Sequence, residues 1–313
     1  MMRVVFFGTP ELAVPFLQAL AQDAQFEVVG VVTMPDKPSG RGKQLAESPI
    51  KRVAQAWRAT LFQPERLKDP VIIESLKKLD ADAFVVVAYG KIIPPTILAI
   101  PRLGCVNVHP SLLPAWRGPS PRQAAIEAGD QTSGVTIMVL DEGMDTGPLL
   151  ASKKIPLAKD ETTESFTKKV CEEGPSLLLE TLRAYAAGTL SPKPQDNTKA
   201  TMSRLFTRED GKVNWKEPAE TIERKFRAYQ PWPGLWSAWN RNGKSMRLKW
   251  EGLAIAKNHT LPPCKVLVED EHFFVGTGAG TIEITALQPE GKPPMTSRDF
   301  LHGYSDVSGA TLG

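Results

Sequence analysis

The sequence predicts an α/β fold, with a mostly parallel sheet covered by helices on both faces and a smaller β-barrel after it. Up to Ala187, short Val- and Ile-rich runs alternate with stretches whose apolar spacing suits helices, a pattern typical of such sheets. Residues 188–197 contain two prolines and interrupt this pattern. Short strand-like runs separated by turn residues then indicate a small barrel. We expect a first domain over residues 1–189, a linker over 190–207 and a barrel domain over 208–313.

The individual elements follow from local patterns. Strands are expected at residues 4–7, 28–32, 84–87, 106–108 and 135–140, and in the barrel at 246–250, 265–268, 273–276 and 282–286. Helices are expected at residues 12–20, 50–56, 71–79, 122–128 and about 163–187. Thr9, Ser48 and Asp69 each stand before a proline and are expected to cap helices. Pro15 is expected to kink the first helix or to delay its start.

Composition excludes several classes of protein. Of 313 residues, 42% are hydrophobic and 23% are charged, as in ordinary globular proteins. No apolar run approaches the ~18–20 residues of a membrane-spanning helix, and a strand begins too early for a signal segment. The three cysteines form no CxxC pair, which predicts free thiols in the cytoplasm and no metal site. Gly8 is followed by Pro10 and Ala13 instead of the glycines of a dinucleotide loop, so nicotinamide binding is not expected.

Two basic stretches predict contact with a polyanion. Residues 203–250 contain eleven Lys or Arg against five Asp or Glu, together with five of the seven Trp. Cations suit phosphates and aromatic rings suit exposed bases, although a solvated barrel surface with Trp in its core is an equal alternative. Residues 34–52 carry five basic and two acidic side chains in a loop rich in Pro and Gly. This loop is expected near the ligand edge of the sheet; the alternative is an ordinary solvated loop.

The strongest chemical signal is the strand end at Asn107 and His109. Residues two apart on a strand share a face, so an amide and an imidazole should project together. Asp145, or else Asp141, is expected to approach His109 from the loop after another apolar strand. An amide N–H can stabilise the oxyanion of a tetrahedral intermediate, and an imidazole paired with a carboxylate can move protons near neutral pH. This set suits direct transfer of an acyl group to an amine; the alternative is a structural His–Asp pair, which is the more common case for such a pair taken alone.

The motif around these residues resembles a known family. The run Asn107-Val108-His109-Pro110-Ser111-Leu112-Leu113-Pro114, followed by Trp116-Arg117-Gly118, is similar to the signature of the 10-formyltetrahydrofolate-dependent formyltransferases. Residues 141–147 resemble that family's second catalytic loop. Five further segments resemble the branch that formylates methionyl-tRNA: residues 7–10, 35–43, 86–90, 231–234 and 287–292 with Met295. The resemblance therefore extends over nearly the whole chain.

The resemblance implies a Rossmann-like formyltransferase domain, an OB-like tRNA-binding barrel and a set of site residues. The implied reaction moves the formyl group of 10-formyltetrahydrofolate, a co-substrate, to the α-amino group of methionine on initiator tRNA, with no metal and with the enzyme as a monomer in the cytoplasm. The implied catalytic residues are Asn107, His109 and Asp145. The implied folate contacts are Ser111, Leu112, Leu113, Pro114, Tyr89, Ile92, Ile93 and Asp141. The implied tRNA contacts are Lys37, Arg41 and Lys43.

Two alternatives differ from this hypothesis in substrate or in class. A related folate-dependent enzyme could formylate a small amine, such as a nucleotide precursor or an amino sugar; it would need neither basic stretch. A non-catalytic RNA-binding protein could keep the same fold without chemistry, and His109 would then be dispensable. The run Ser111 to Pro114 also has a purely structural alternative, because a Pro-bounded apolar turn can simply pack the strand end.

Overall fold

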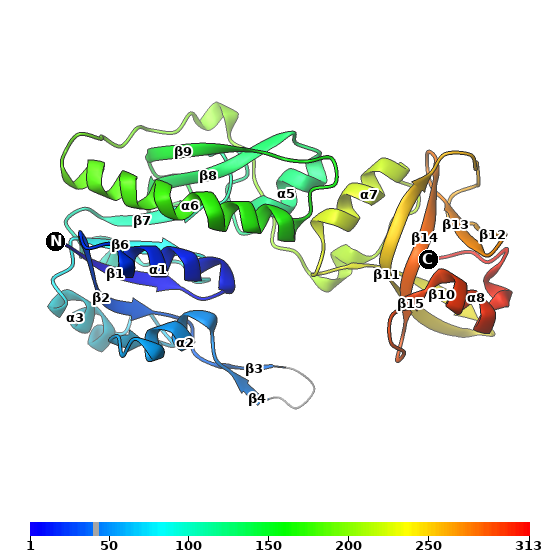
Figure 1. Cartoon of the computed structure of the whole chain (residues 1–313), viewed down its shortest axis with the longest axis horizontal. Coiled ribbons are helices and arrows are strands. Elements are labelled where there is room, and N and C mark those ends of the chain that lie inside the picture. Colours follow the sequence, from blue (N-terminus) through cyan, green and yellow to red (C-terminus); the bar gives the residue numbers. More distant parts are fainter. Residues whose placement is uncertain (40–43) are drawn as a thin grey trace. The chain divides into compact units, whose positions relative to one another are not determined.

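The computed structural model describes residues 1–39 and 44–313, which form two compact units (Figure 1). The first unit comprises residues 1–121, 132–156 and 166–203, and the second comprises residues 122–131, 157–165 and 204–313. The domain boundaries expected at residues 189 and 208 stay a prediction. Among the described residues, no helix combines the length and apolar character needed to cross a membrane.

The first unit contains the predicted mostly parallel sheet, which is confirmed. In spatial order its strands are β5 (Leu61–Phe62), β2 (Phe26–Val32), β1 (Met2–Gly8), β6 (Ala83–Val87), β7 (Cys105–His109), β8 (Thr132–Val139) and β9 (Leu149–Pro156). The strands from β5 to β7 run parallel, whereas β8 and β9 join as antiparallel strands. β7 is therefore an interior strand, with a parallel neighbour on one side and an antiparallel neighbour on the other.

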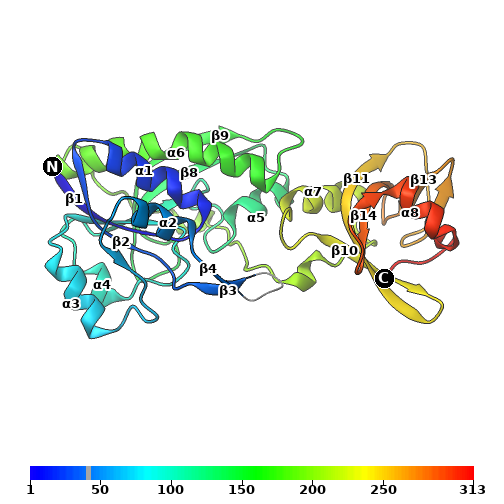
Figure 2. The same cartoon turned by 60° about the horizontal axis from the view of Figure 1, so that its bottom comes forward.

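Helices cover both faces of this sheet. The helices up to residue 186 are α1 (Val14–Gln22), α2 (Pro49–Ala56), α3 (Pro70–Lys78), α4 (Pro95–Leu98), α5 (Pro121–Ala128) and α6 (Thr163–Ala186). Figure 2 shows α1 and α6 together on one side of the strands, with α3 and α4 on the other. Leu76 of α3 and Ile97 of α4 pack in one core cluster with Phe7 and Phe84 of the sheet. A short antiparallel hairpin, β3 (Lys37–Ser39) with β4 (Gln44–Ala46), lies outside the main sheet.

Two of the predicted helix caps are confirmed. The Ser48 hydroxyl accepts a hydrogen bond from the backbone N–H of Lys51 at 3.0 Å, and a proline follows at the start of α2. The Asp69 carboxylate accepts from the backbone N–H of Val71 at 2.9 Å at the start of α3. Each cap satisfies a backbone donor that the first turn of a helix leaves unpaired.

The expected cap at Thr9 is wrong, because its hydroxyl is used elsewhere. Thr9 donates to the backbone carbonyl of Tyr89 at 2.8 Å, which ties the end of β1 to the end of β6. A 3₁₀ turn, Glu11–Ala13, comes first and has no side-chain cap, and α1 begins at Val14. The delay expected from Pro15 is thus confirmed, since proline fits the first turn of a helix but not its interior.

The second unit is built on an antiparallel sheet that curls into a half-barrel, as expected for a small β-barrel domain. Its main path is β10 (Leu235–Arg241), β11 (Lys244–Ala256), β14 (Thr281–Pro289), β13 (His272–Gly276) and β12 (Val266–Glu269); β15 (Met295–Thr296) pairs with β14. Helices α7 (Ala219–Ala228) and α8 (Ser297–Gly303) belong to the same unit. The C-terminal residues 310–313 run between the two edge strands of this sheet. Gly313 pairs with Ala238 of β10, and the backbone N–H of Leu312 donates to the carbonyl of Cys264, which precedes β12.

Most of the tryptophans in the basic stretch form the core of this unit. Trp215, Trp239 and Trp250 are at most 2% exposed. The Ser237 hydroxyl accepts from the indole N–H of Trp215 at 3.0 Å and from that of Trp250 at 3.3 Å. For these three residues the core interpretation is therefore correct. Trp232 is 50% exposed, and Trp236 is partly exposed.

Replacing Ser237 by alanine is expected to destabilise the second unit. The change removes the one hydroxyl that accepts from two buried indole N–H groups, and an unpaired buried donor costs ~1–3 kcal/mol. We expect the free energy of unfolding, measured by chemical denaturation, to fall by about 2–4 kcal/mol. Ser245→Ala, at an exposed position of β11, is the matched control and should change it by less than ~0.5 kcal/mol. Equal effects of the two variants would contradict the role of Ser237.

Candidate active site

β7 carries the first two candidate residues to the carboxyl edge of the sheet. Asn107 and His109 are two residues apart, so their side chains leave the strand on the same face. They are 9% and 4% exposed, respectively. His109 lies opposite Thr136 of the antiparallel neighbour β8. The position of both side chains is therefore set by an interior strand.

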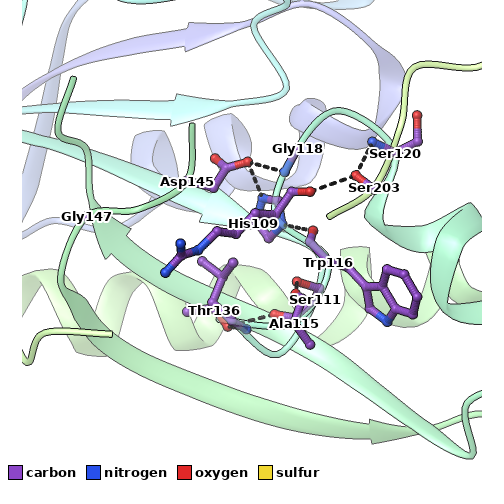
Figure 3. A network of polar contacts seen from close by, with 12 residues as sticks. His109, Ser111, Ala115, Trp116, Gly118, Ser120, Thr136, Asp145, Gly147 and Ser203 are labelled. Carbon is purple, nitrogen blue, oxygen red and sulfur yellow. Dashed lines mark hydrogen bonds and ion pairs between the residues drawn. The ribbon is translucent and has the colours of Figure 1, made fainter. Parts of the chain in front are cut away.

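His109 makes a different contact through each ring nitrogen. Its Nε2 lies 2.9 Å from the backbone carbonyl of Trp116, and its Nδ1 lies 3.6 Å from the Asp145 carboxylate (Figure 3). A carbonyl oxygen only accepts, so Nε2 must carry the hydrogen in this contact. In the neutral ring, Nδ1 is then the bare nitrogen, and it faces an acid. The carboxylate is therefore placed to stabilise the ring once Nδ1 takes up a proton.

Asp145 is fixed on its loop by backbone contacts. Its carboxylate also accepts a hydrogen bond from the backbone N–H of Gly118 at 2.8 Å, which Figure 3 shows beside His109. Its backbone has a φ of +53°, in the left-handed region that most residues avoid. Ala88, directly after β6, and Trp116, in the loop after β7, share this unusual conformation with φ of +48° and +60°. Strained backbone of this kind often gathers at functional sites.

The second acidic candidate, Asp141, forms hydrogen bonds within its own loop. Its carboxylate accepts from the backbone N–H of Gly143 at 3.1 Å and from the Thr146 hydroxyl at 2.7 Å. These contacts shape the loop that carries Asp145. Asp145 is accordingly the carboxylate that the structure brings to His109, and Asp141 organises the loop.

Burial lowers the pKa of His109 below its ordinary value of 6.5. The charge of Asp145 and the hydrogen bond to the Trp116 carbonyl raise the pKa in part, but desolvation of the charged ring is the largest effect. The imidazole is therefore neutral near pH 7 and can accept a proton. Beside it, the structure assigns the Asn107 side-chain amide no hydrogen bond to any described residue, so its N–H groups are available to a substrate oxygen.

The predicted folate-contact run begins with a loop held against β8. The Ser111 hydroxyl donates to the Ala115 carbonyl at 2.6 Å, and Ser111 is fully buried. The Thr136 hydroxyl donates to the Ser111 carbonyl at 2.6 Å and accepts from the backbone N–H of Leu113 at 3.1 Å. Leu112 lies close above Gly134, where an added Cβ would lie 2.6 Å from its side chain. This bracing supports the structural role of the run from Ser111 to Pro114, while contact with folate stays a prediction.

The other predicted folate residues differ in exposure. Tyr89 is 2% exposed and packs edge-to-face on Phe7 at 5.4 Å between ring centroids, and burial raises its pKa to about 12. Ile93 is 7% exposed and belongs to the same core cluster. Ile92, by contrast, is 83% exposed and lines a cavity of about 420 Å³ with Lys91. Of these three side chains, only that of Ile92 is exposed, and contact with folate stays a prediction for all three.

The predicted tRNA contacts fall only partly within the described residues. Lys37 is exposed at the start of the β3–β4 hairpin. Arg41 and Lys43 lie outside the described residues. Contact of the basic residues in the stretch 34–52 with a polyanion therefore stays a prediction. In the described ranges, no group of three or more His, Cys, Asp or Glu side chains is placed to hold a metal ion.

The structure adds residues that sequence patterns missed, all from the stretch predicted as a linker. Gln195 accepts two hydrogen bonds from the Arg117 guanidinium and donates to the backbone of the Asp145 loop. Thr201 accepts through its hydroxyl from the backbone N–H of Trp116 at 2.8 Å, and Ser203 contacts the Arg117 carbonyl. The only local signal was the group of uncharged polar side chains after two prolines, and such groups are common in loops.

Comparison with known families covers both units. The formyl transferase family model matches residues 2–182, and the formyl transferase C-terminal domain model matches residues 206–305. The methionyl-tRNA formyltransferase of Roseiflexus castenholzii is 43% identical over 312 residues, which cover 100% of this chain and 99% of that protein. That of Pseudoalteromonas translucida is 40% identical over 317 residues, which cover 100% of this chain and 98% of that protein.

Solved structures share the fold at low identity. HypX from Aquifex aeolicus, solved in complex with tetrahydrofolic acid, superimposes with a TM-score of 0.63 and 19% identity over 98% of this chain and 48% of that one. This chain thus spans about half the length of HypX. An N-formyltransferase from Helicobacter canadensis gives a TM-score of 0.62 and 18% identity, over 91% of this chain and 99% of that one. At these identities the likeness concerns the fold alone.

The lowered pKa of His109 can be measured by an NMR titration of labelled histidines. We expect His109 to titrate below 6.5, because its charged form is buried. The folded state thus favours the neutral ring, so this group's contribution to stability is full above pH ~6.5 and declines as pH falls below that value. Asp145→Asn removes the charge that raises the pKa and should lower it further. A midpoint above 6.5 in the unaltered protein would contradict this assignment.

Proposed function

Because this chain belongs to the formyl transferase family, we propose that it moves the formyl group of 10-formyltetrahydrofolate to the α-amino group of methionyl initiator tRNA. The product, N-formylmethionyl-tRNA, starts translation. The observation that carries the proposal is the buried His109 paired with Asp145 beside the Asn107 amide, in a chain similar over its whole length to methionyl-tRNA formyltransferases. We place this activity in the cytoplasm, in a monomer with domains over residues 1–189 and 208–313.

Asn107 is proposed to stabilise developing negative charge. When an amine attacks a formyl carbon, charge accumulates on the formyl oxygen. The Asn107 amide is nearly buried, on a rigid strand, and has no hydrogen bond to a described residue. An N–H donor fixed in this way needs little rearrangement to bind an oxyanion, and loss of such a donor typically costs ~2.7–4 kcal/mol of transition-state stabilisation.

His109 and Asp145 are proposed to move the protons. The attacking amine must lose a proton, and the folate nitrogen that leaves must gain one. Neutral His109 can take a proton at Nδ1, and Asp145 stabilises the resulting imidazolium from 3.6 Å. The Trp116 carbonyl keeps the hydrogen on Nε2 and so leaves Nδ1 as the basic atom. No side-chain nucleophile is required, since direct transfer between the two nitrogens accounts for the products.

The folate is proposed to bind between the Tyr89–Ile93 segment and the loop from Asp141 to Asp145. Ile92 offers an exposed apolar side chain on the first of these segments, and the Asp141 turn shapes the second. Tyr89 and Ile93 pack in the core cluster and are proposed to position this segment for the folate. Ser111 and Leu113 likewise act by holding their loop on β8, and Leu112 and Pro114 complete the turn.

The tRNA is proposed to contact the basic hairpin through Lys37, Arg41 and Lys43, and the second unit through a cation–aromatic surface. There, the Arg247 guanidinium lies 4.5 Å from the ring centroid of Trp236, and the ammonium of Lys212 lies 5.9 Å from it. Partly exposed rings flanked by cations suit unpaired bases and phosphates. An enzyme for small amines would have no use for either surface.

Formylation of charged initiator tRNA tests the proposal directly. With 10-formyltetrahydrofolate we expect the full chain to formylate methionyl-tRNA, and Asp145→Asn to lower kcat by about 10²–10⁴, as expected for loss of a proton-transfer group. Asp160→Asn makes the same change at an exposed position outside these contacts, so it is the matched control and should retain most activity. Unformylated tRNA together with rapid formylation of an amino sugar or a nucleotide amine would overturn the proposal.

Salt dependence tests the electrostatic part of tRNA binding. We expect the affinity for tRNA to fall linearly with salt on a logarithmic plot, because phosphate contacts release counterions. Arg41→Ala should raise the KM for tRNA and reduce the slope by about one, with folate binding unchanged. Lys78→Ala, an exposed cation on α3, is the control and should leave both values as they are. A flat salt response would remove the electrostatic contribution.

A further inference from the structure

The side-chain amide of Gln195 uses all of its hydrogen-bonding positions within the first unit. Its Nε2 donates to the backbone carbonyls of Asp145 at 2.8 Å and Gly147 at 2.7 Å. Its Oε1 accepts from Nε and Nη2 of Arg117 at 3.1 and 2.8 Å. A glutamine amide offers two donors and two acceptor positions, so this one is saturated. It joins the loop that carries Asp145 to the loop that follows β7.

Both loops that Gln195 joins also meet at the Asp145 carboxylate. Arg117 is 6% exposed, and its carbonyl accepts from the backbone N–H of Ser203 at 2.7 Å. The next residue, Gly118, donates its N–H to Asp145 at 2.8 Å. Gln195 therefore acts on Asp145 in two ways. It donates a hydrogen bond to the Asp145 backbone carbonyl, and it holds Arg117, the residue before the Gly118 N–H that binds the Asp145 carboxylate.

The backbone that Gln195 holds is one that needs support. Asp145 has a φ of +53°, and an added Cβ at Gly147 would lie 1.9 Å from the Val139 carbonyl. A conformation of this kind persists only where surrounding contacts determine it, since each strained residue costs ~1–3 kcal/mol. The two hydrogen bonds from Gln195 bracket Thr146 and fix the chain on both sides of it. A small relaxation here would change the distance between Asp145 and His109.

We propose that Gln195 is a positioning residue, which sets the Asp145 carboxylate against Nδ1 of His109 by holding the Asp145 backbone. The inference rests on the proposed function for its kinetic consequences. The effect of Gln195 on the position of Asp145 can be tested without that function, because the pKa of His109 responds to where Asp145 lies. The stretch expected to be a linker is thereby assigned a part in organising the site.

The kinetic test compares Gln195→Met with a matched control. Methionine has a similar length but removes all four hydrogen bonds, and a displacement of about 1 Å at a proton-transfer pair can cost ~10²-fold in rate. We expect kcat to fall by about this factor, with the KM for tRNA nearly unchanged. Asn197→Ala removes a 2.8 Å hydrogen bond from the same Arg117 guanidinium and leaves both hydrogen bonds to the Asp145 loop in place. This control should keep kcat within about threefold of the original.

The second readout is the pKa of His109 in the protein without substrates. Asp145 is the charged group that raises this pKa, and the Trp116 carbonyl faces the other ring nitrogen. Displacement of Asp145 in Gln195→Met should therefore shift the NMR titration of His109 downward, in the direction of Asp145→Asn. Asn197→Ala should leave the titration in place. A loss of stability alone, with an intact site, would not produce this pattern.

A double-mutant cycle decides whether Gln195 works through Asp145. In the Asp145→Asn background, Gln195→Met should cause little further loss of kcat, because the group it positions is already gone. An undiminished further loss, or an unchanged His109 titration, would overturn the proposal. If Gln195→Met does not fold, Gln195→Asn keeps the amide on a shorter arm and must show the same downward shift of the His109 pKa. Absence of formylation by the unaltered protein would instead refute the proposed function, and the titration would still test the positioning.

Discussion

A buried imidazole with one nitrogen committed to a backbone carbonyl is the constraint on which this site depends. Because the Trp116 carbonyl accepts from Nε2 of His109, Nδ1 is left as the basic atom, and Asp145 stands opposite it. Burial then favours the neutral ring and lowers the pKa of His109. The loop after β7 thus sets the tautomer of His109 and the direction of its basic nitrogen, and burial sets its protonation state.

Rigid surroundings keep this geometry in place. His109 ends an interior strand, and Thr136 of the neighbouring strand braces the loop that follows it through two hydrogen bonds. The loop that carries Asp145 has that residue in the left-handed conformation. Asp141, in the same loop, binds Thr146, and Gln195, from a distant segment, binds the Asp145 carbonyl.

The second unit shows how the same residue types serve two purposes. Trp215 and Trp250 share the Ser237 hydroxyl inside the unit, whereas Trp236 lies partly exposed under Arg247. Alternation along β10 explains the difference, because Ser237 faces inward and its neighbour Trp236 faces outward. Composition alone treats these rings alike, and only their register in the sheet separates core from candidate RNA surface.

The sequence by itself determined most of the elements and the candidate residues of the site. Strand and helix periods, the caps at Ser48 and Asp69, and the Asn107–His109 spacing are local properties that neighbouring residues specify. Tertiary structure alone decided that Asp145 and not Asp141 faces His109, that Tyr89 and Ser111 are buried, and that Gln195 joins the loops. These outcomes depend on distances between segments far apart in the chain, which packing sets and no local pattern encodes.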